Sequence, residues 1–307
     1  MTHSEIESAV SDISSFAIVK ESADMRDYTT FKTGGTADIL AYPASIEGAS
    51  KLIRYAHEKN IPLTIIGGGS NLIISDQGIR GIAIRMAEDD VLKGTIEERG
   101  EGIIYADAIV RKRDLIEFAV SHGYAGTKFM AGIPGCVGGG IRMNAGTFMG
   151  TFIDILDRIH YVDYSGNIKE LTLTKDMAHY RGIDLDDALI IYGAVFNLPI
   201  RGEVKTLRAE IEEIITDRKQ KHPQDPSAGS VFKNPDGHFS WKLVNDAGLK
   251  GKKIGGAMVS DLHTNFIINA GGATSSDIRE LIGFVRSTVK DKFGVELNTE
   301  VRFVGEF

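Results

Sequence analysis

Three consecutive glycines, Gly67 to Gly69, interrupt an apolar stretch of the sequence and are followed by Ser70 and Asn71. Because glycine has no Cβ and takes positive φ at little cost, successive backbone N–H groups can converge on one point here. Such a concave backbone binds anions, and serine and asparagine side chains can add hydrogen bonds to it. The chemistry indicated is the binding of a phosphate or a diphosphate.

The same stretch has a simpler interpretation. Isoleucines at 65–66 and 73–74 flank the glycines and predict strand, tight turn and strand, which often make only a hairpin. The residues alone favour neither interpretation. A helical dinucleotide fingerprint is excluded because Leu72 stands where its third glycine is needed, and the chain contains no P-loop motif. A dinucleotide bound here would therefore lie between strands rather than at a helix N-terminus.

The 35 glycines of the chain cluster instead of scattering. Besides the triplet, they concentrate at 132–150 and 251–272, and no repeat or low-complexity segment accounts for them. Separate glycine-rich loops predict several approaches of the backbone to one extended ligand.

Composition excludes several classes of partner and site. The 307 residues carry a net charge of −7 without a basic run, and no apolar run is long enough to span a membrane, so neither nucleic acid nor a membrane is an expected partner. The single cysteine, Cys136, excludes a disulfide framework and fits a reducing compartment. His222, His238 and His263 lack ligand spacing, so no metal is expected. Because the N-terminus has no signal-peptide pattern, we expect a cytoplasmic protein.

The elements that must position the glycine loops follow from hydrophobic periodicity. Residues 1–24 are expected to form a surface helix and a connector. A first domain, 1–86, is then predicted as a βαββ unit, with a strand at 37–42, a helix at 46–59, the strands around the glycine triplet and a strand at 82–84.

Two further domains are predicted, at 87–200 and 201–307. The second should contain a strand at 103–106, a helix through Leu115 and Val120 that ends at Gly123, the glycine-rich segment 131–150, and strands at 159–162 and 189–198 with a turn at 165–167. The third should contain a helix at 204–215, a proline-rich loop from His222, a strand at 264–269, a helix over 278–293 and a closing strand at 301–303. Thr274 and Asp277 predict a capping box at the start of that last helix.

Several motifs in one order point to a family. They are YTTFKTGG (28–35), IIGGGSNLIISD (65–76), AGIPGCVGGGIRMNAG (131–146), Tyr180-Arg181, PSAGSVFKNP (226–235), VSDLHTNFIIN (259–269) and TEVRFVG (299–305). From Tyr28 to Gly305 the chain resembles the UDP-N-acetylenolpyruvoylglucosamine reductases, in their shorter, loop-lacking type.

The resemblance implies an α+β fold of the FAD-binding kind shared with vanillyl-alcohol oxidase, in which two α+β subdomains hold FAD and a C-terminal α+β domain binds substrate. FAD would be bound without a covalent bond, so Cys136 is expected to be a packed side chain rather than a tether. The implied cofactor-binding residues are Ile66, Gly67, Gly68, Gly69, Ser70, Asn71, Leu72, Gly132, Ile133, Pro134, Gly135, Gly138 and Gly139.

The implied reaction is reduction of an enolpyruvyl ether, UDP-N-acetylglucosamine-enolpyruvate, by NADPH through FAD, which yields a peptidoglycan precursor. By resemblance, Ser230 is the proton donor, and Arg181 and Glu300 stabilise the charge on the substrate's carboxylate and enolate. The resemblance further implies substrate contacts from Asn234, Arg302 and Lys221.

Simpler roles exist for two of these residues, and one position departs from the family pattern. Ser230 could be a hydrogen-bonding turn residue, and Glu300 could form a strand-end ion pair with Arg302. The family usually has serine two residues after the arginine, where this chain has Ile183, so a contact that orients Arg181 is in question.

Two other functions compete with the reductase. A sugar or alcohol oxidase of the same flavin fold would pass electrons to oxygen, often through a tethered FAD. A nucleotide-binding relative without enzymatic activity is the third possibility, against which the joint presence of Ser230, Arg181 and Glu300 argues. We expect a monomer that acts on a UDP-sugar, and leave open the preference between NADPH and NADH.

Overall fold

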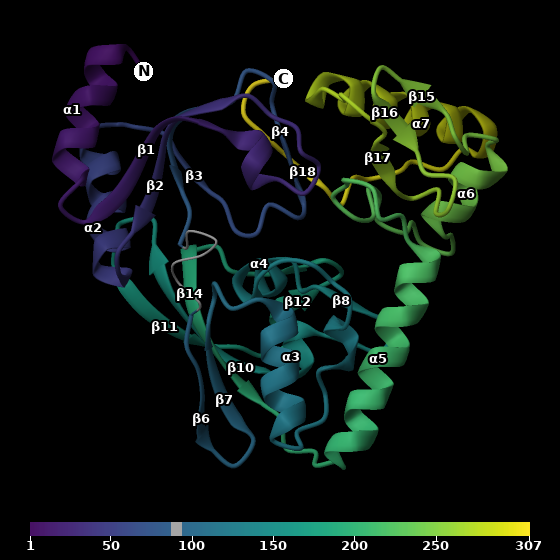
Figure 1. Cartoon of the computed structure of the whole chain (residues 1–307), viewed down its shortest axis with the longest axis horizontal. Helices are drawn as coiled ribbons and strands as arrows, with labels where there is room; N and C mark the ends of the chain where they lie inside the picture. Colours follow the sequence, from purple (N-terminus) through teal and green to yellow (C-terminus); the bar gives the residue numbers. More distant parts are fainter. Residues whose placement is uncertain (87–93) are drawn as a thin grey trace. The chain divides into compact units, whose positions relative to one another are not determined.

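The computed structural model describes residues 1–86 and 94–307 (Figure 1). Two compact units are found, and neither is one continuous stretch. The first comprises Met1–Lys20, Ile39–Gly68 and Gly81–Arg218, and the second comprises Glu21–Asp38, Gly69–Arg80 and Lys219–Phe307. The three linear domains stay a prediction, and the start of the second, 87–93, lies outside the described residues.

The described helices and strands mix throughout the chain, as the predicted α+β class requires. The helices are α1 (His3–Ile13), α2 (Ile46–Glu58), α3 (Lys112–Ser121), α4 (Val137–Arg142), α5 (Val204–Lys221), α6 (Ser240–Asp246) and α7 (Ser275–Phe293). The strands are β1 (Ala17–Asp24), β2 (Thr36–Pro43), β3 (Leu63–Ile65), β4 (Leu72–Ile74), β5 (Ile79–Ile84), β6 (Ile96–Gly100), β7 (Ile103–Asp107), β8 (Gly146–Thr147), β9 (Gly150–Thr151), β10 (Leu156–Asp163), β11 (Ile168–Thr172), β12 (Ala178–His179), β13 (Gly182–Ile183), β14 (Ala188–Asn197), β15 (Lys253–Ile254), β16 (Ala257–Val259), β17 (Ile267–Asn269) and β18 (Arg302–Val304).

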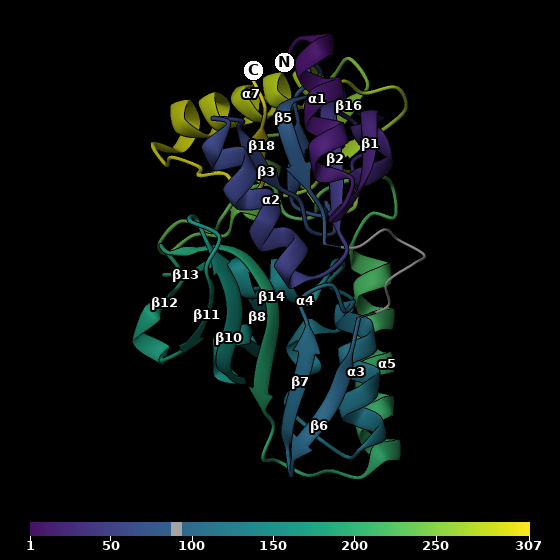
Figure 2. The same ribbon diagram turned by 90° about the vertical axis from the view of Figure 1, so that its left-hand side faces the viewer.

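A five-stranded antiparallel sheet, ordered β11-β10-β14-β7-β6, supports the first unit. Helix α3 buries Leu115 and Ala119 against it because apolar residues recur at helical spacing. Leu207 and Ile211 of α5 enter the same core, and Figure 2 shows α3 and α5 on one side of the sheet. Gly123 follows α3 with φ +74°, so the predicted C-terminal glycine is confirmed.

A four-stranded sheet, ordered β1-β2-β5-β3, has α2 against it. The prediction of α2 is confirmed, and Ser45 caps it by accepting a hydrogen bond from the Gly48 N–H. The expected connector before residue 24 is wrong in part, because Ala17–Asp24 is strand β1. This strand lies at the sheet edge and includes the charged pair Lys20-Glu21, so no apolar alternation marks it.

The two strands that flank the glycine triplet have different partners. Strand β3 pairs with β5, whereas β4 pairs with β18, both in parallel. The hairpin interpretation is therefore wrong, since the flanking strands do not pair with each other. The triplet therefore does not serve as the turn of a hairpin, and the prediction that its backbone binds a ligand remains.

The second unit has a core of its own, built on α7 and the three-stranded sheet β15-β16-β17. Helix α7 buries Ile278, Leu281 and Val285 on one face. Its predicted capping box is confirmed: Thr274 Oγ1 accepts from the Asp277 N–H, and Asp277 accepts from the Thr274 N–H.

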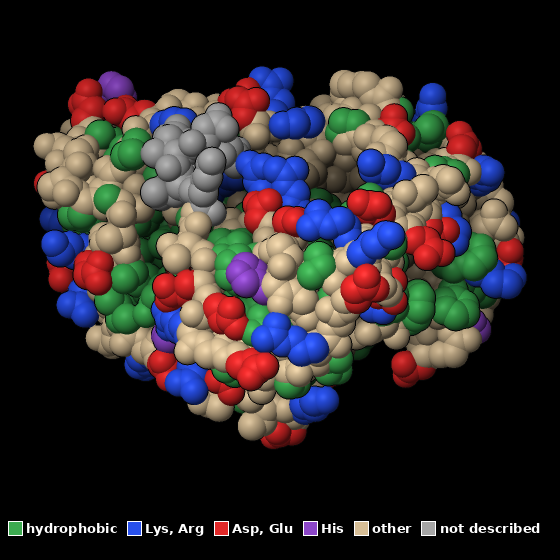
Figure 3. All heavy atoms as spheres, turned by 60° about the horizontal axis from the view of Figure 1, so that its bottom comes forward, with side chains coloured by type: hydrophobic (Ala, Val, Ile, Leu, Met, Phe, Trp, Pro, Cys, Tyr) green, Lys and Arg blue, Asp and Glu red, His purple; other side chains and the backbone are tan. Residues whose placement is uncertain are grey.

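The surface and the helices add two observations on partners. Acidic and basic side chains are interspersed over the face shown in Figure 3. Within residues 1–86 and 94–307, every helix falls short of the length and apolar character that a membrane span needs, and no group of three or more His, Cys, Asp or Glu could hold a metal ion.

Candidate functional site

The two predicted cofactor loops meet in the first unit. A Cβ built on Gly68 would lie 3.0 Å from the Cα of Gly135. The first glycine loop, Gly67–Gly69, and the second glycine loop, Gly132–Gly140, therefore touch through their backbones, with no side chain between them at this point. Gly68 and Gly135, more than sixty positions apart in the sequence, thus bring the two glycine-rich backbones together.

At two of these positions, neither close packing nor a positive φ requires glycine within the described chain. Gly67 and Gly139 do not have positive φ, and a Cβ on either would meet no atom within 4 Å. At Gly69, in contrast, φ is +64° and a Cβ would overlap the carbonyl oxygen of Tyr28, so the fold itself requires glycine there. Open backbone at Gly67 and Gly139 leaves room for a ligand to approach closely, which fits the diphosphate or ring system of FAD.

Backbone hydrogen bonds hold the second glycine loop against the segment before α3. The Val137 N–H donates to the Val110 carbonyl at 2.9 Å, and the Gly138 N–H donates to the Ala108 carbonyl at 2.9 Å. The expected loop also contains a short helix, α4, which the sequence pattern did not indicate. A Cβ on Gly140 would lie 2.5 Å from the Phe152 ring, so this glycine lets α4 pack on an aromatic core residue.

The remaining predicted cofactor residues have mixed roles in the described chain. Ile66 is buried, and its N–H donates to the Ile84 carbonyl at 2.8 Å. The side-chain amide of Asn71 donates to the Glu300 carbonyl at 3.0 Å, which gives it a structural hydrogen bond. Ser70 precedes β4 and Leu72 is its first residue, whereas Ile133 and Pro134 lie in irregular backbone between Gly132 and Gly135.

Ser230 and Glu300 lie on neighbouring backbone segments of the second unit. Ser230 forms an isolated antiparallel bridge with Phe266, and the Glu300 N–H donates to the carbonyl of Val231 at 2.7 Å. Within the described part of the chain, the Ser230 hydroxyl makes no hydrogen bond, although the side chain is partly exposed. A serine that stabilised a turn would use its hydroxyl on the backbone. The role of a turn residue therefore loses support.

Arg181 belongs to the first unit, where it ends a two-residue connection between β12 and β13. Its φ is +64°, a conformation that is costly for any residue with a Cβ, and its guanidinium carbon lies 5.0 Å from the Tyr180 ring centroid. Strain of this kind is often retained at functional sites. Ile183, at the position in question, is 5% exposed and packs in the hydrophobic core.

The three predicted substrate contacts are exposed residues of the second unit. Asn234 Oδ1 accepts a hydrogen bond from the Ser240 N–H at 3.0 Å, so it also holds the start of α6. The backbone N–H of Arg302 donates to the Asn71 carbonyl at 2.9 Å, and the residue is exposed. Lys221 is the last residue of α5.

Arg218 lies against the second glycine loop. A Cβ on Gly132 would come within 2.9 Å of Arg218 Cδ, and the buried Nε of Arg218 has no hydrogen-bond partner among the described residues. Burial, and then repulsion from Arg181, lower the pKa of Arg218. Two cationic side chains are thus held close together beside backbone that carries no side chains.

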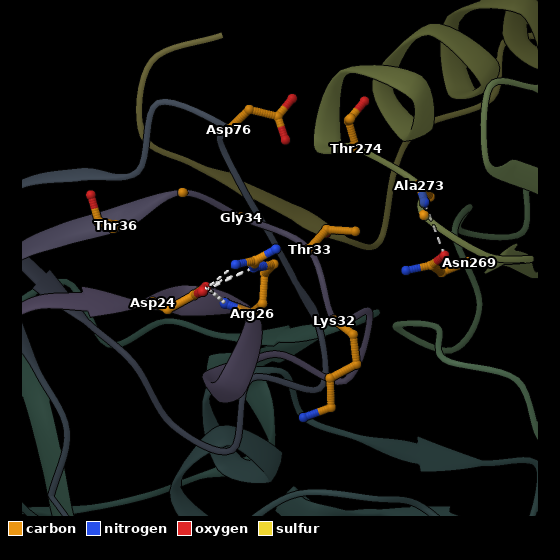
Figure 4. A pocket seen from close by; sticks show the side chains of 12 residues that line it. Asp24, Arg26, Lys32, Thr33, Gly34, Thr36, Asp76, Asn269, Ala273 and Thr274 are labelled. Carbon is orange, nitrogen blue, oxygen red and sulfur yellow. Dashed lines mark hydrogen bonds and ion pairs between the residues drawn. The ribbon is translucent and has the colours of Figure 1, made fainter.

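A separate cleft of about 440 Å³ in the second unit contains none of the predicted site residues (Figure 4). Asp24 and Arg26, two residues apart in the chain, form an ion pair in its wall, and Lys32 also lines it. Its walls explain part of the motif sequence. A Cβ on Gly35 would overlap the Asp76 carbonyl oxygen, and the Asp76 carboxylate accepts from the N–H groups of Ser275 and Ser276 at the start of α7. These motif residues therefore build the scaffold of the second unit.

Known proteins resemble the chain over nearly its whole length. Residues 221–304 match the model for the UDP-N-acetylenolpyruvoylglucosamine reductase C-terminal domain, and residues 37–172 match an FAD binding domain. The UDP-N-acetylenolpyruvoylglucosamine reductase of Listeria monocytogenes serovar 1/2a is 41% identical over 290 residues, which are 94% of this chain and 95% of the relative. The chain belongs to the UDP-N-acetylenolpyruvoylglucosamine reductase family.

Other members of the reductase family also match over nearly the whole chain. The enzyme of Caldanaerobacter subterraneus subsp. tengcongensis is 40% identical over 288 residues, with 92% of each chain covered. The crystal structure of the reductase from Thermus caldophilus superposes with a TM-score of 0.78 at 28% identity, covering 94% of this chain and all of that one. The FAD-binding fold with a C-terminal reductase domain, predicted from the sequence, is thereby confirmed.

Proposed function

We propose that this chain reduces UDP-N-acetylenolpyruvoylglucosamine to UDP-N-acetylmuramate, with FAD bound without a covalent bond and NADPH as the electron donor. The observation that carries the proposal is the placement of Ser230 and Glu300 on paired backbone within a chain of this family. The match to a reductase-specific C-terminal domain favours this reaction over a sugar or alcohol oxidase. In this proposal residues 1–200 hold FAD and residues 201–307 bind the UDP-sugar.

Both glycine loops would hold FAD. Backbone N–H groups at Gly67–Gly69 would bind its diphosphate, and Gly135, Gly138 and Gly139 would let the cofactor approach the second loop. When bound, FAD would take up hydride from NADPH and pass it to the substrate. The chain's own residues have to bind the substrate, orient its enolpyruvyl group and deliver a proton.

The proton is the task of Ser230. Hydride adds to the β-carbon of the enolpyruvyl group, the C=C π-electron pair moves to the α-carbon, and the serine hydroxyl gives its proton to that carbon. A hydroxyl without a hydrogen-bond partner in the described chain can turn toward the substrate without breaking a bond. Water would then return the proton to Ser230.

Arg181 and Glu300 would act on the charge that develops during this transfer. A guanidinium group binds a carboxylate in a bidentate manner, so Arg181 fits the carboxylate of the enolpyruvyl group. Glu300, as a carboxylic acid, would donate a hydrogen bond to the enolate oxygen on which negative charge builds. Asn234, Arg302 and Lys221 would contact the remainder of the UDP-sugar.

A single assay separates this function from its competitors. NADPH oxidation by the FAD-loaded protein is followed at saturating NADPH, with and without UDP-N-acetylenolpyruvoylglucosamine, while hydrogen peroxide is measured in parallel. Oxidation that depends on substrate and produces one UDP-N-acetylmuramate per NADPH supports the reductase. Peroxide formed in proportion to an added sugar or alcohol would support an oxidase, and no turnover in either arm would support a relative without enzymatic activity.

A further inference from the structure

Lys112 is a buried lysine beside the second glycine loop. It is the first residue of α3, is 4% exposed, and its N–H donates to the Gly135 carbonyl at 3.2 Å. The preceding residue, Arg111, forms a backbone bridge with Cys136. Lys112 is therefore tied to the glycine loop through the backbone itself, at the residue where the two glycine loops meet.

The charge on Lys112 is unfavourable in the folded chain for three reasons. Its ammonium group is removed from water, Arg218 repels it, and it stands at the N-terminus of a ten-residue helix, where the partial positive charge of the helix lies. Burial chiefly lowers the pKa of Lys112 to about 8; Cys136 acts in the opposite direction, and a smaller repulsion from Arg218 adds to the lowering. Within the described residues no carboxylate pairs with it.

Arg218 adds positive charge to the surroundings of Lys112, and Cys136 offsets only part of the cost of burial. Arg218 packs over Gly132 and is itself repelled by Arg181, with only partial compensation from the neighbouring Asp217. Lys112 and Arg218 thus form a cationic group beside the second glycine loop. A buried like-charged group of this kind costs stability unless an anion is bound nearby.

We propose that Lys112 contributes its positive charge to the binding of FAD, and that the negative charge of the cofactor is what compensates the cationic group. The inference rests on the proposed function, since it takes the second glycine loop as the FAD site. The negative charge has two sources on one cofactor: the diphosphate in every state, and the isoalloxazine ring after reduction. The shared chemistry is an anion held beside Gly135.

The test compares Lys112→Met, which keeps length and apolar stem without charge, with Arg113→Met as a matched control. Arg113 is the next residue of α3, and its side chain is 72% exposed beside Asp114. The apoproteins are unfolded thermally at pH 7 and pH 10, and FAD dissociation constants are measured by flavin fluorescence between pH 6.5 and pH 10. The midpoint potential of bound FAD is measured for each variant.

We expect Lys112→Met to raise the unfolding midpoint of the apoprotein at pH 7 while weakening FAD binding at least about tenfold. Opposite effects on stability and affinity are the signature that a structural residue would not produce. In the wild type, FAD binding should weaken as pH rises above about 8, because the cofactor prefers the protonated lysine; in Lys112→Met this dependence should be absent. Arg113→Met should change the dissociation constant less than about twofold.

The remaining outcomes decide between the sources or reject the inference. An unchanged midpoint potential assigns the compensating charge to the diphosphate, and a lower potential assigns it to the reduced isoalloxazine. FAD affinity equal to wild type in Lys112→Met, or a loss of affinity together with a loss of apoprotein stability, would overturn the inference. A wild-type protein that binds no FAD at all would instead reject the proposed function.

Discussion

The backbone N–H of Glu300 donates a 2.7 Å hydrogen bond to the carbonyl of Val231, the residue that follows Ser230. The position of Ser230 relative to Glu300 is therefore fixed by main-chain pairing and not by flexible side chains. Asn71 extends the connection, because its amide donates to the Glu300 carbonyl. Part of the predicted catalytic chemistry thus rests on backbone hydrogen bonds that substitutions of the side chains should leave in place.

This placement allows a sharp prediction for Ser230→Ala. The variant should fold normally, since the hydroxyl makes no hydrogen bond within the described chain. Reduction of bound FAD by NADPH should stay close to wild type, and reoxidation by the enolpyruvyl substrate should slow at least about 10²-fold, or about 2.7 kcal/mol of barrier. Stopped-flow absorbance of each half-reaction measures the two effects separately.

Ser230→Cys serves as the control for this prediction. Because a thiol is a stronger acid than a hydroxyl, its reoxidation rate should lie between those of Ser230→Ala and wild type. If Ser230→Ala were reoxidised at the wild-type rate, the proton would have to come from another group.

Arg181 allows charge and backbone strain to be separated. Arg181→Ala and Arg181→Gly both remove the guanidinium group, so both should slow substrate-dependent reoxidation while leaving NADPH-dependent reduction nearly intact. At φ +64° only glycine is unstrained, so Arg181→Gly should be more stable to unfolding than Arg181→Ala by about 1 kcal/mol. Denaturant unfolding measures the difference. Wild-type turnover in both variants would withdraw the arginine from the reaction.

The glycines divide into those that the fold requires and those that it does not. Gly67→Ala and Gly139→Ala should leave the apoprotein's free energy of unfolding within about 1 kcal/mol of wild type and weaken FAD binding, since an added Cβ meets only open space. Gly69→Ala should instead destabilise the protein, because its Cβ would overlap the Tyr28 carbonyl oxygen. Denaturant unfolding and FAD titration of all three decide this. Unchanged FAD affinity in both Gly67→Ala and Gly139→Ala would contradict the assignment of these loops.

We expect Asp163 to make the free energy of unfolding decrease in acid. Although burial raises its pKa, hydrogen bonds from Lys169, Asn167 and Ser165 outweigh this and hold the pKa well below its usual range. A carboxylate with a depressed folded pKa stabilises the protein above its unfolded pKa of about 3.9, and the contribution is lost as pH falls further. The free energy of unfolding should therefore fall more steeply below about pH 4 in wild type than in Asp163→Asn. Asp186→Asn is the exposed control, and an identical acid response in both variants would reject the role.

Local signals were enough to predict some elements. The apolar spacing of α2 and the capping box of α7 belong to residues a few positions apart, so the sequence contains all the information that these helices need. Strands β6 and β11 were missed because their residues are largely exposed and charged, without alternation. Helix α4 was missed because consecutive glycines are poor helix formers, and it depends on the packing of Gly140 against Phe152, which only the tertiary structure shows.

The candidate site divides in the same way. The glycine loops could be predicted because clustered glycines weaken a fold unless the backbone has to turn sharply or be approached closely, and the motif order added the catalytic residues. The role of Lys112 could not be predicted, because the sequence Arg-Lys-Arg-Asp around it has the composition of a solvated surface. One local clue existed: a lysine at the first position of a helix opposes the helix dipole. The burial that makes it significant depends on a glycine loop more than twenty residues away.

The pairing of β4 with β18 has a consequence for synthesis on the ribosome. Ile73 is opposite Phe303, so the strand that follows the first glycine loop has to wait for nearly the last residues of the chain. At about 5–20 residues per second, that delay is on the order of 10–50 s. Throughout this interval Ile73 and Ile74, buried in the finished protein, have no strand partner from β18. A nascent chain with an exposed apolar strand is a substrate for chaperones, so we expect production of this protein to depend on them more than its size alone suggests.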